Sequence, residues 1–197
     1  MNQSIFPTKI YDGVPLRLVP HAPDNGYLFY VSFDGSIGLR IAPDGVETRV
    51  NATPTTCENC KILSNANRMQ RYWQFKQAWG LREHILASHA VYSAWSGKPV
   101  PLYHQIHHLN GITTDNRFDN LLCVLFREHR SIADVRQSAI KAAVPNGDLT
   151  RVPYDVLRRL QDPRVLPDAD FPAELQRELA KLNLVSTIHG RFPSPAW

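Results

Sequence analysis

The sequence predicts an α+β fold, in which a small antiparallel N-terminal sheet precedes a strand–loop–strand–helix unit and short C-terminal helices. Three observations support this prediction. Apolar and polar residues alternate between glycine turns early in the chain, two apolar strands precede a stretch of helical periodicity in the middle, and short amphipathic stretches lie between prolines at the end. The expected regions are 1–80 (the sheet), 81–145 (the strand–loop–strand–helix unit) and 146–197 (a helical tail).

Turn residues mark the ends of the strands in the N-terminal region. Four prolines predict irregular structure over residues 1–26, because proline lacks the N–H that strands and helices donate. Asp34-Gly35 and Asp44-Gly45 are typical of hairpin turns. The strands expected here are 16–19, 27–33, 36–41 and 46–50.

A loop, a further strand and a helix are expected next. Residues 51–68 are polar and predict a loop, 71–77 predict a strand, and 81–86 predict a short strand or the start of a helix. From Ser88, apolar residues recur at helical spacing until Gly97 ends the helix.

The middle of the chain predicts the strand–loop–strand–helix unit. Its expected elements are a strand at 103–109, a turn-rich loop at 110–120, a strand at 121–126 and a helix at 127–143. One face of this helix would carry Ile132, Val135, Ala139 and Ile140. Two short amphipathic helices, 154–160 and 172–184, are expected in the tail.

The charge balance is mildly basic. The chain of 197 residues has 22 Lys and Arg against 18 Asp and Glu, a formal charge of +4, which is compatible with a nucleic-acid partner. No apolar run approaches the roughly 20 residues that cross a bilayer, and residues 1–9 lack the pattern of a secretory signal. We therefore expect a cytoplasmic protein with no membrane partner.

The three cysteines are an odd number, which argues against a disulfide framework. Cys57 and Cys60 form a CxxC pair, which in one interpretation would supply half of a structural zinc site. The other half would come from His84 and His89, or from Cys123. The alternative interpretation is a pair of thiols in a loop that binds no metal.

Two adjacent histidines, His107 and His108, are the strongest functional signal in the chain. Histidine both binds metals and exchanges protons near neutral pH. Neighbouring residues of a strand face opposite sides, so the two imidazoles cannot do the same task. The pair therefore indicates a division of labour between a metal ligand and a general base.

The surrounding residues resemble the HNH endonucleases, whose active site is a ββα-metal motif. The resemblance extends over 89–130. It rests on the helix and Gly-x-x-x-Pro turn at 89–101, on His107-His-Leu-Asn-Gly111, on Asp115-Asn-Arg117 and Asp119-Asn-Leu121, and on His129, nine positions after Asn120.

The resemblance implies a role for each residue of the site. His108 would be the general base, His107 and His129 would hold one divalent metal ion, and Asn120 would orient the base or brace the loop. Mg²⁺ is the expected ion, with Mn²⁺ or Zn²⁺ as alternatives. Some family members carry a further histidine one helical turn after the third, and here Ala133 occupies that position, which predicts weaker capture of metal.

Three arginines near the motif, Arg117, Arg127 and Arg130, are candidates for phosphate contact or for solvated surface ion pairs. Asn110 and Asn116 are expected to stabilise the loop through side-chain-to-backbone hydrogen bonds.

Three functional hypotheses follow. The first is a metal-dependent, site-selective or nicking HNH endonuclease of phage or homing type that acts on DNA, and a double-strand break would then require a homodimer or a second event. The second is an inactive nucleic-acid-binding or assembly module that uses the motif as a scaffold. The third is a toxin-like nuclease with little sequence preference and an acidic protein partner.

Overall fold

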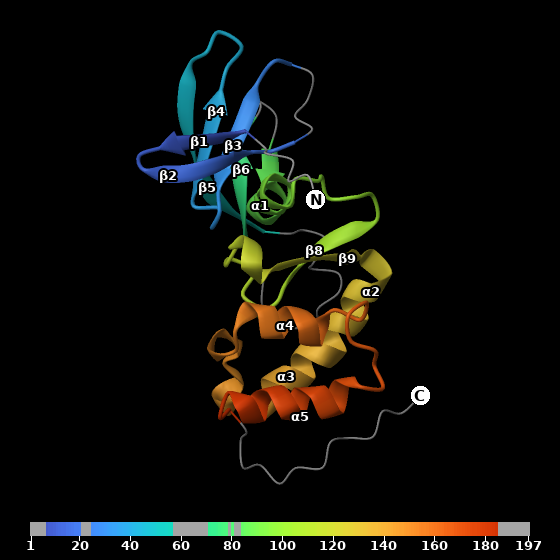
Figure 1. Ribbon diagram of the computed structural model, residues 1–197. Coiled ribbons are helices and arrows are strands. Elements are labelled where there is room, and N and C mark those ends of the chain that lie inside the picture. Colours follow the sequence, from blue (N-terminus) through green and yellow to red (C-terminus); the bar gives the residue numbers. More distant parts are fainter. Residues whose placement is uncertain (1–6, 21–24, 57–70, 79, 81–83, 185–197) are drawn as a thin grey trace. The chain divides into compact units, whose positions relative to one another are not determined.

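The computed structural model describes residues 7–20, 25–56, 71–78, 80 and 84–184 (Figure 1). The chain divides into two compact units, Met1–Arg130 and Ser131–Trp197. The first unit holds an antiparallel sheet followed by a two-stranded ribbon, and the second is helical. The predicted α+β class is therefore confirmed. None of the described helices is long and apolar enough to cross a membrane.

Seven strands form the N-terminal sheet, and each pairs antiparallel with the next one along the chain. Asp-Gly turns with glycine at positive φ connect several of them, as at Gly35 and Gly45. The strands are β1 (Thr8–Tyr11), β2 (Val14–Leu18), β3 (Leu28–Ser32), β4 (Ile37–Ile41), β5 (Glu47–Thr56), β6 (Arg71–Lys76) and β7 (His84–Leu86).

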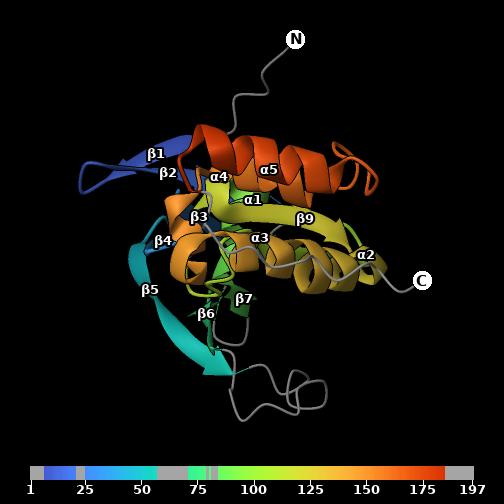
Figure 2. The same ribbon diagram turned by 90° about the horizontal axis from the view of Figure 1, so that it is seen from below.

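Two predictions about this sheet were wrong. Residues 8–18 form a β1–β2 hairpin instead of mostly irregular structure, because the Asp12-Gly13 turn, with φ of 50° and 76°, brings the two strands together around Pro15. Residues 51–56 continue β5 as one long strand where a loop was expected (Figure 2). The polar threonines there pair with the aromatic β6, and β-branched residues suit a strand even when they are polar.

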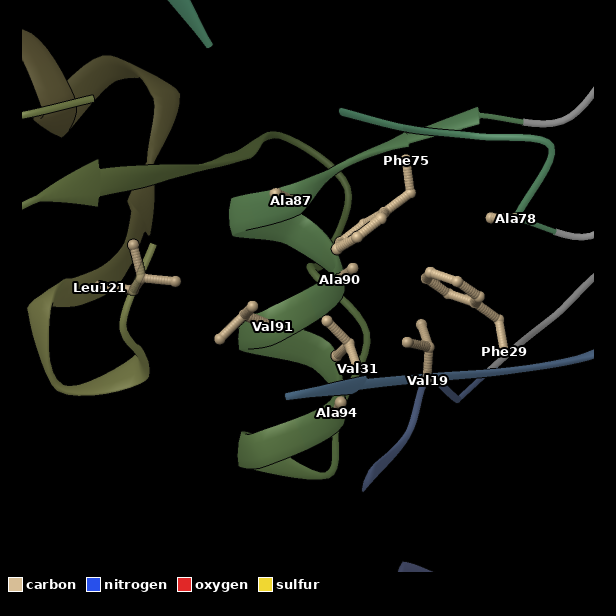
Figure 3. Close-up of a cluster of buried hydrophobic side chains, with 10 residues drawn as sticks. All are labelled: Val19, Phe29, Val31, Phe75, Ala78, Ala87, Ala90, Val91, Ala94 and Leu121. Atoms are coloured by element: carbon tan, nitrogen blue, oxygen red, sulfur yellow. The ribbon is translucent and has the colours of Figure 1, made fainter. Parts of the chain in front are cut away.

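One helix, α1 (Ala87–Ser96), provides the core between the sheet and the ribbon that follows. In Figure 3 its small residues face Phe29 and Phe75 on one side, and Val91 points toward Leu121 on the other. The two phenylalanine rings meet edge to face at a centroid distance of 5.1 Å. The helix ends at Gly97, whose φ of 72° closes the last turn through a bond to the carbonyl of Ser93.

The ribbon consists of β8 (His104–His108) and β9 (Leu121–Leu125), paired antiparallel. A short 3₁₀ turn, Phe118–Asn120, leads directly into β9, and α2 (Phe126–Ser131) follows directly after it. The predicted strand–loop–strand–helix order is therefore present, with His107 opposite Leu122 and His108 opposite Leu121 in the register.

The second unit contains a π-helical turn (Ile132–Gln137), α3 (Ser138–Ala143), α4 (Tyr154–Gln161) and α5 (Phe171–Lys181). The predicted apolar face at 127–143 was wrong at Val135, which is 63% exposed, whereas Arg136 is buried. A π turn changes the angle between successive side chains, so α-helical spacing does not identify the buried face there.

Candidate active site

The strand β8 ends in the two histidines, and both are buried, with 4% and 5% of their surface exposed. The His107 ring meets that of His129, from α2, edge to face at a centroid distance of 5.2 Å. His108 instead contacts Asn116 in the β8–β9 loop. The structure therefore brings together the two predicted metal ligands and gives the predicted base a different neighbour.

The contact between His108 and Asn116 joins the imidazole Nε2 to the amide Oδ1 at 3.3 Å. The amide nitrogen of Asn116 donates to the carbonyl of Thr114 at 3.4 Å. This second bond turns the amide oxygen toward the histidine. The bond to Thr114 agrees with the loop-stabilising role expected for Asn116, but the contact with His108 was not predicted, because no local spacing relates the two residues.

Asn120 braces the loop between the strands. Its side chain is completely buried, accepts a hydrogen bond from the backbone N–H of Asn110 at 3.0 Å, and donates to the backbone carbonyl of Asp115 at 2.7 Å. It also donates to the Asn110 side-chain oxygen at 3.0 Å. Of the two roles expected for Asn120, these contacts support the bracing of the loop.

Asp115 links the brace to the predicted phosphate contacts. One of its carboxylate oxygens accepts from the Asn110 amide at 2.7 Å, and both accept from the guanidinium of Arg117, at 3.1 and 3.2 Å. The Arg117 side chain is 47% exposed, so this ion pair still faces solvent. Arg127 is exposed on α2, and the side chain of Arg130 lies outside the described residues.

The candidate zinc ligands Cys57 and Cys60 also lie outside the described residues. Among their suggested partners, Cys123 is buried in β9 and His84 is exposed at the start of β7. His89 is half-buried on α1. The three suggested partners, Cys123, His84 and His89, therefore differ in how exposed they are. The zinc site remains a prediction.

Burial lowers the pKa of His108 below the ordinary value for histidine. The hydrogen bond with Asn116 and the negative charge of Asp115 oppose this shift, while His129 and His89 lower the pKa further. Burial also lowers the pKa of His89. The lowered pKa of His108 favours the neutral imidazole, the form that can accept a proton.

The side chains that the resemblance assigns to a metal ion are two imidazoles, those of His107 and His129. Among the residues that the structure describes, no group of three or more His, Cys, Asp or Glu side chains could hold a metal ion. His107 and His129 fit a site with two protein ligands, in which the other positions belong to water and substrate.

The antiparallel strands β8 and β9 are followed directly by the helix α2, which is a ββα arrangement. Of the close histidine pair, His107 lies on β8 and His129 lies on α2. Residues 86–130 match the family model of HNH endonucleases, which confirms the resemblance drawn from the histidines over this segment. The match covers β8, β9 and α2 but neither β1–β6 nor the second unit. No curated protein and no solved structure matches the chain.

Proposed function

We propose that this protein is a metal-dependent endonuclease that hydrolyses DNA phosphodiester bonds and nicks one strand per encounter. The observation that supports this proposal is the contact between the rings of His107 and His129, with the buried His108 as the next residue of β8 after His107. The match to HNH endonucleases covers all three residues. The excess of basic residues suits a polyanionic substrate.

Each residue has a task in this reaction. His108 accepts the proton of the attacking water, which requires the neutral imidazole that its burial favours. His107 and His129 would hold the divalent metal ion, which would supply stabilisation of the charge on the phosphate and on the departing 3′ oxygen. Asn120 keeps the loop closed between the two strands, so that His108 and the metal ligands stay in register.

The identity of the metal depends on two opposing considerations. Weak capture by two ligands favours Mg²⁺, the expected ion, because it is abundant. Imidazole nitrogens, however, suit transition-metal ions better than Mg²⁺, which prefers oxygen ligands. A metal series that includes Mg²⁺, Mn²⁺ and Zn²⁺ separates these considerations.

The test is cleavage of supercoiled plasmid by the purified protein with EDTA or with each metal. We expect metal-dependent nicked circles, and we expect His108→Ala to abolish them. His104→Ala is the matched control, because His104 lies on the same strand and its Nδ1 contacts only the nearby carbonyl of Leu102 among the bonds described for it. Cleavage that survives His108→Ala would refute the base assignment. A band shift without any cleavage would instead favour the binding or assembly module.

A further inference from the structure

The turn between β3 and β4 in the N-terminal sheet packs directly against the loop that carries Asn116. Gly35 lies in this turn with a φ of 71°, and a Cβ built on it would stand 3.2 Å from the Cβ of Asn116. The same Cβ would stand 3.0 Å from Cγ2 of Val91 on α1. These distances are tighter than ordinary Cβ contacts, so a side chain here would displace its neighbours by a few tenths of an ångström, and glycine permits the close approach of the two segments.

Two further contacts fix the turn against the loop. The backbone N–H of Phe118 donates to the carbonyl of Phe33 at 3.0 Å, and the two rings meet edge to face at 6.1 Å. Within the turn, Asp34 accepts hydrogen bonds from the hydroxyl of Ser32 at 2.6 Å and from the backbone N–H of Ser36 at 3.0 Å. The turn is therefore held by its own hydrogen bonds, and it is joined to the loop by backbone as well as side-chain contacts.

Asn116 connects this support to His108. An amide oxygen can only accept a hydrogen bond, so the 3.3 Å contact requires that Nε2 of His108 carries the hydrogen. In a neutral imidazole the lone pair then lies on Nδ1. Because the Asn116 amide is oriented by its own bond to Thr114 and by the packing of Gly35, the choice of tautomer depends on residues outside the ribbon.

We propose that Asn116 is a positioning residue that fixes Nδ1 as the proton-accepting nitrogen of His108, and that the Asp34-Gly35 turn of the N-terminal sheet holds Asn116 in place. The catalytic consequence rests on the proposed nuclease function, whereas the tautomer does not. Gly35 lies outside the segment that matches the HNH endonucleases. The working site of this chain therefore includes part of the sheet.

The direct test is the tautomer of His108, read from the ¹⁵N shifts of the histidine side chains at mildly alkaline pH, where imidazole is neutral. We expect the hydrogen on Nε2 in the unaltered protein and in Asn116→Asp, which loses the bond to Thr114 but still offers His108 an acceptor oxygen. We expect a mixture of tautomers in Asn116→Ala. An Asn116→Ala protein that keeps the Nε2 hydrogen would overturn the proposal.

The catalytic test uses the same variants in the plasmid assay. Loss of a residue that orients a reacting group costs about 10- to 100-fold, and we expect Asn116→Ala to lose this factor in kcat with little change in KM. Ile112→Ala is the control within the loop, because its side chain is exposed and its backbone bond to Asn110 is retained. An equal loss in Ile112→Ala would show that general loop damage, rather than the His108 contact, causes the effect.

The role of the sheet is tested with Gly35→Ala against Gly45→Ala. Both glycines have positive φ in turns of the same sheet, but a Cβ on Gly45 meets nothing within 4 Å. The backbone penalty is thus similar, and only Gly35→Ala pushes on Asn116. We expect the tautomer mixture and the fall in kcat in Gly35→Ala alone, and the same result in both variants would overturn the role of the turn.

The two proposals can fail separately. If the unaltered protein cuts no substrate with any metal, the proposed function fails, while the ¹⁵N measurement still decides whether Asn116 and Gly35 set the tautomer. Thermal melting of each variant shows whether Gly35→Ala unfolds the β3–β4 hairpin. If it does, the Asn116 variants still test whether Asn116 sets the tautomer of His108.

Discussion

The two units of this protein both bury polar side chains, but they bury different kinds. In the first unit the buried polar residues around the ribbon are imidazoles and amides: His107, His108, Asn110, Asn116 and Asn120. In the second unit the buried polar residues include charged side chains of both signs: Arg136, Asp162, Glu174 and Glu178.

The charged groups of the second unit are neutralised within that unit. Arg136 forms an ion pair with Asp168 and donates to the backbone carbonyls of Leu160 and Leu166 at 3.0 and 2.7 Å. Its guanidinium also lies 5.2 Å from the centre of the Phe171 ring. The guanidinium of Arg136 therefore uses its hydrogen bonds to hold the helices together, and few of its N–H groups remain to bind a ligand.

The imidazoles of the first unit behave in the opposite way. Burial is the main cause that lowers the pKa of His108, and His129 and His89 lower it further, because neighbouring imidazoles repel one another once they are protonated. A cluster of this kind favours deprotonated nitrogens, which are the form that binds metals and accepts protons. A cluster of buried imidazoles therefore indicates a site that can bind metal or accept protons. Buried charges of opposite sign that pair with one another indicate a structural role.

The largest effect in this comparison is expected from Arg136→Met. Asp168 is 76% exposed and can be solvated, but the variant leaves the carbonyls of Leu160 and Leu166 without their donor, and each unsatisfied buried group costs about 1–3 kcal/mol. The packing of the guanidinium on Phe171 is lost as well, so the second unit should become much less stable. Hydrogen exchange measured by mass spectrometry checks this, with protection lost in peptides from 131–184 and retained in β3, β4 and α1. Loss of protection in those elements of the first unit as well would contradict the view that Arg136 stabilises only its own unit.

A smaller effect is expected from Asn120→Ala. The variant leaves the N–H of Asn110 and the carbonyl of Asp115 without their amide partner, and each unsatisfied buried group costs about 1–3 kcal/mol. Denaturant titration of the unaltered and variant proteins measures the loss. If Asn120 only braces the loop, the cleavage rate per folded molecule should change less than in His108→Ala, and an equal loss without destabilisation would assign Asn120 to the chemistry.

The smallest effect is expected on acid stability through Glu178. Hydrogen bonds from Lys181 at 2.6 Å and Arg159 at 2.7 Å lower the pKa of this carboxyl. A carboxyl with a lowered folded-state pKa stabilises the protein above its unfolded pKa, and the contribution disappears as the pH falls through the folded pKa. Thermal melting across acid pH should therefore show a shallower pH dependence for Glu178→Gln, and identical slopes would contradict the assignment.

The ribbon and its histidines could be predicted because their signals are local. His107, His108 and Asn120 lie close together in sequence, and the alternation of a strand fixes which faces the two histidines take. His129 follows at a fixed spacing on the next helix. The resemblance therefore identified the segment that matches the family, and the structure brings the rings of His107 and His129 together as expected.

The remaining features depend on contacts between distant parts of the chain. The bond of Asn116 to His108 and the approach of Gly35 to Asn116 join segments whose spacing has no periodic signal. The buried Arg136 was also not predictable, because a π turn changes the face on which it lies. In each case tertiary packing decides a role that local propensity leaves open.

The alternation of β8 has a consequence for how this chain can tolerate change in length. The two histidines stand next to each other, so inserting or deleting a single residue within the strand would exchange their faces. The proposed ligand would then face Asn116, and the proposed base would face His129, although every side chain needed for the reaction would still be present. A residue inserted in a surface turn such as Asp44-Gly45 would leave the faces of both histidines unchanged, so the constraint on length applies to the five residues of β8.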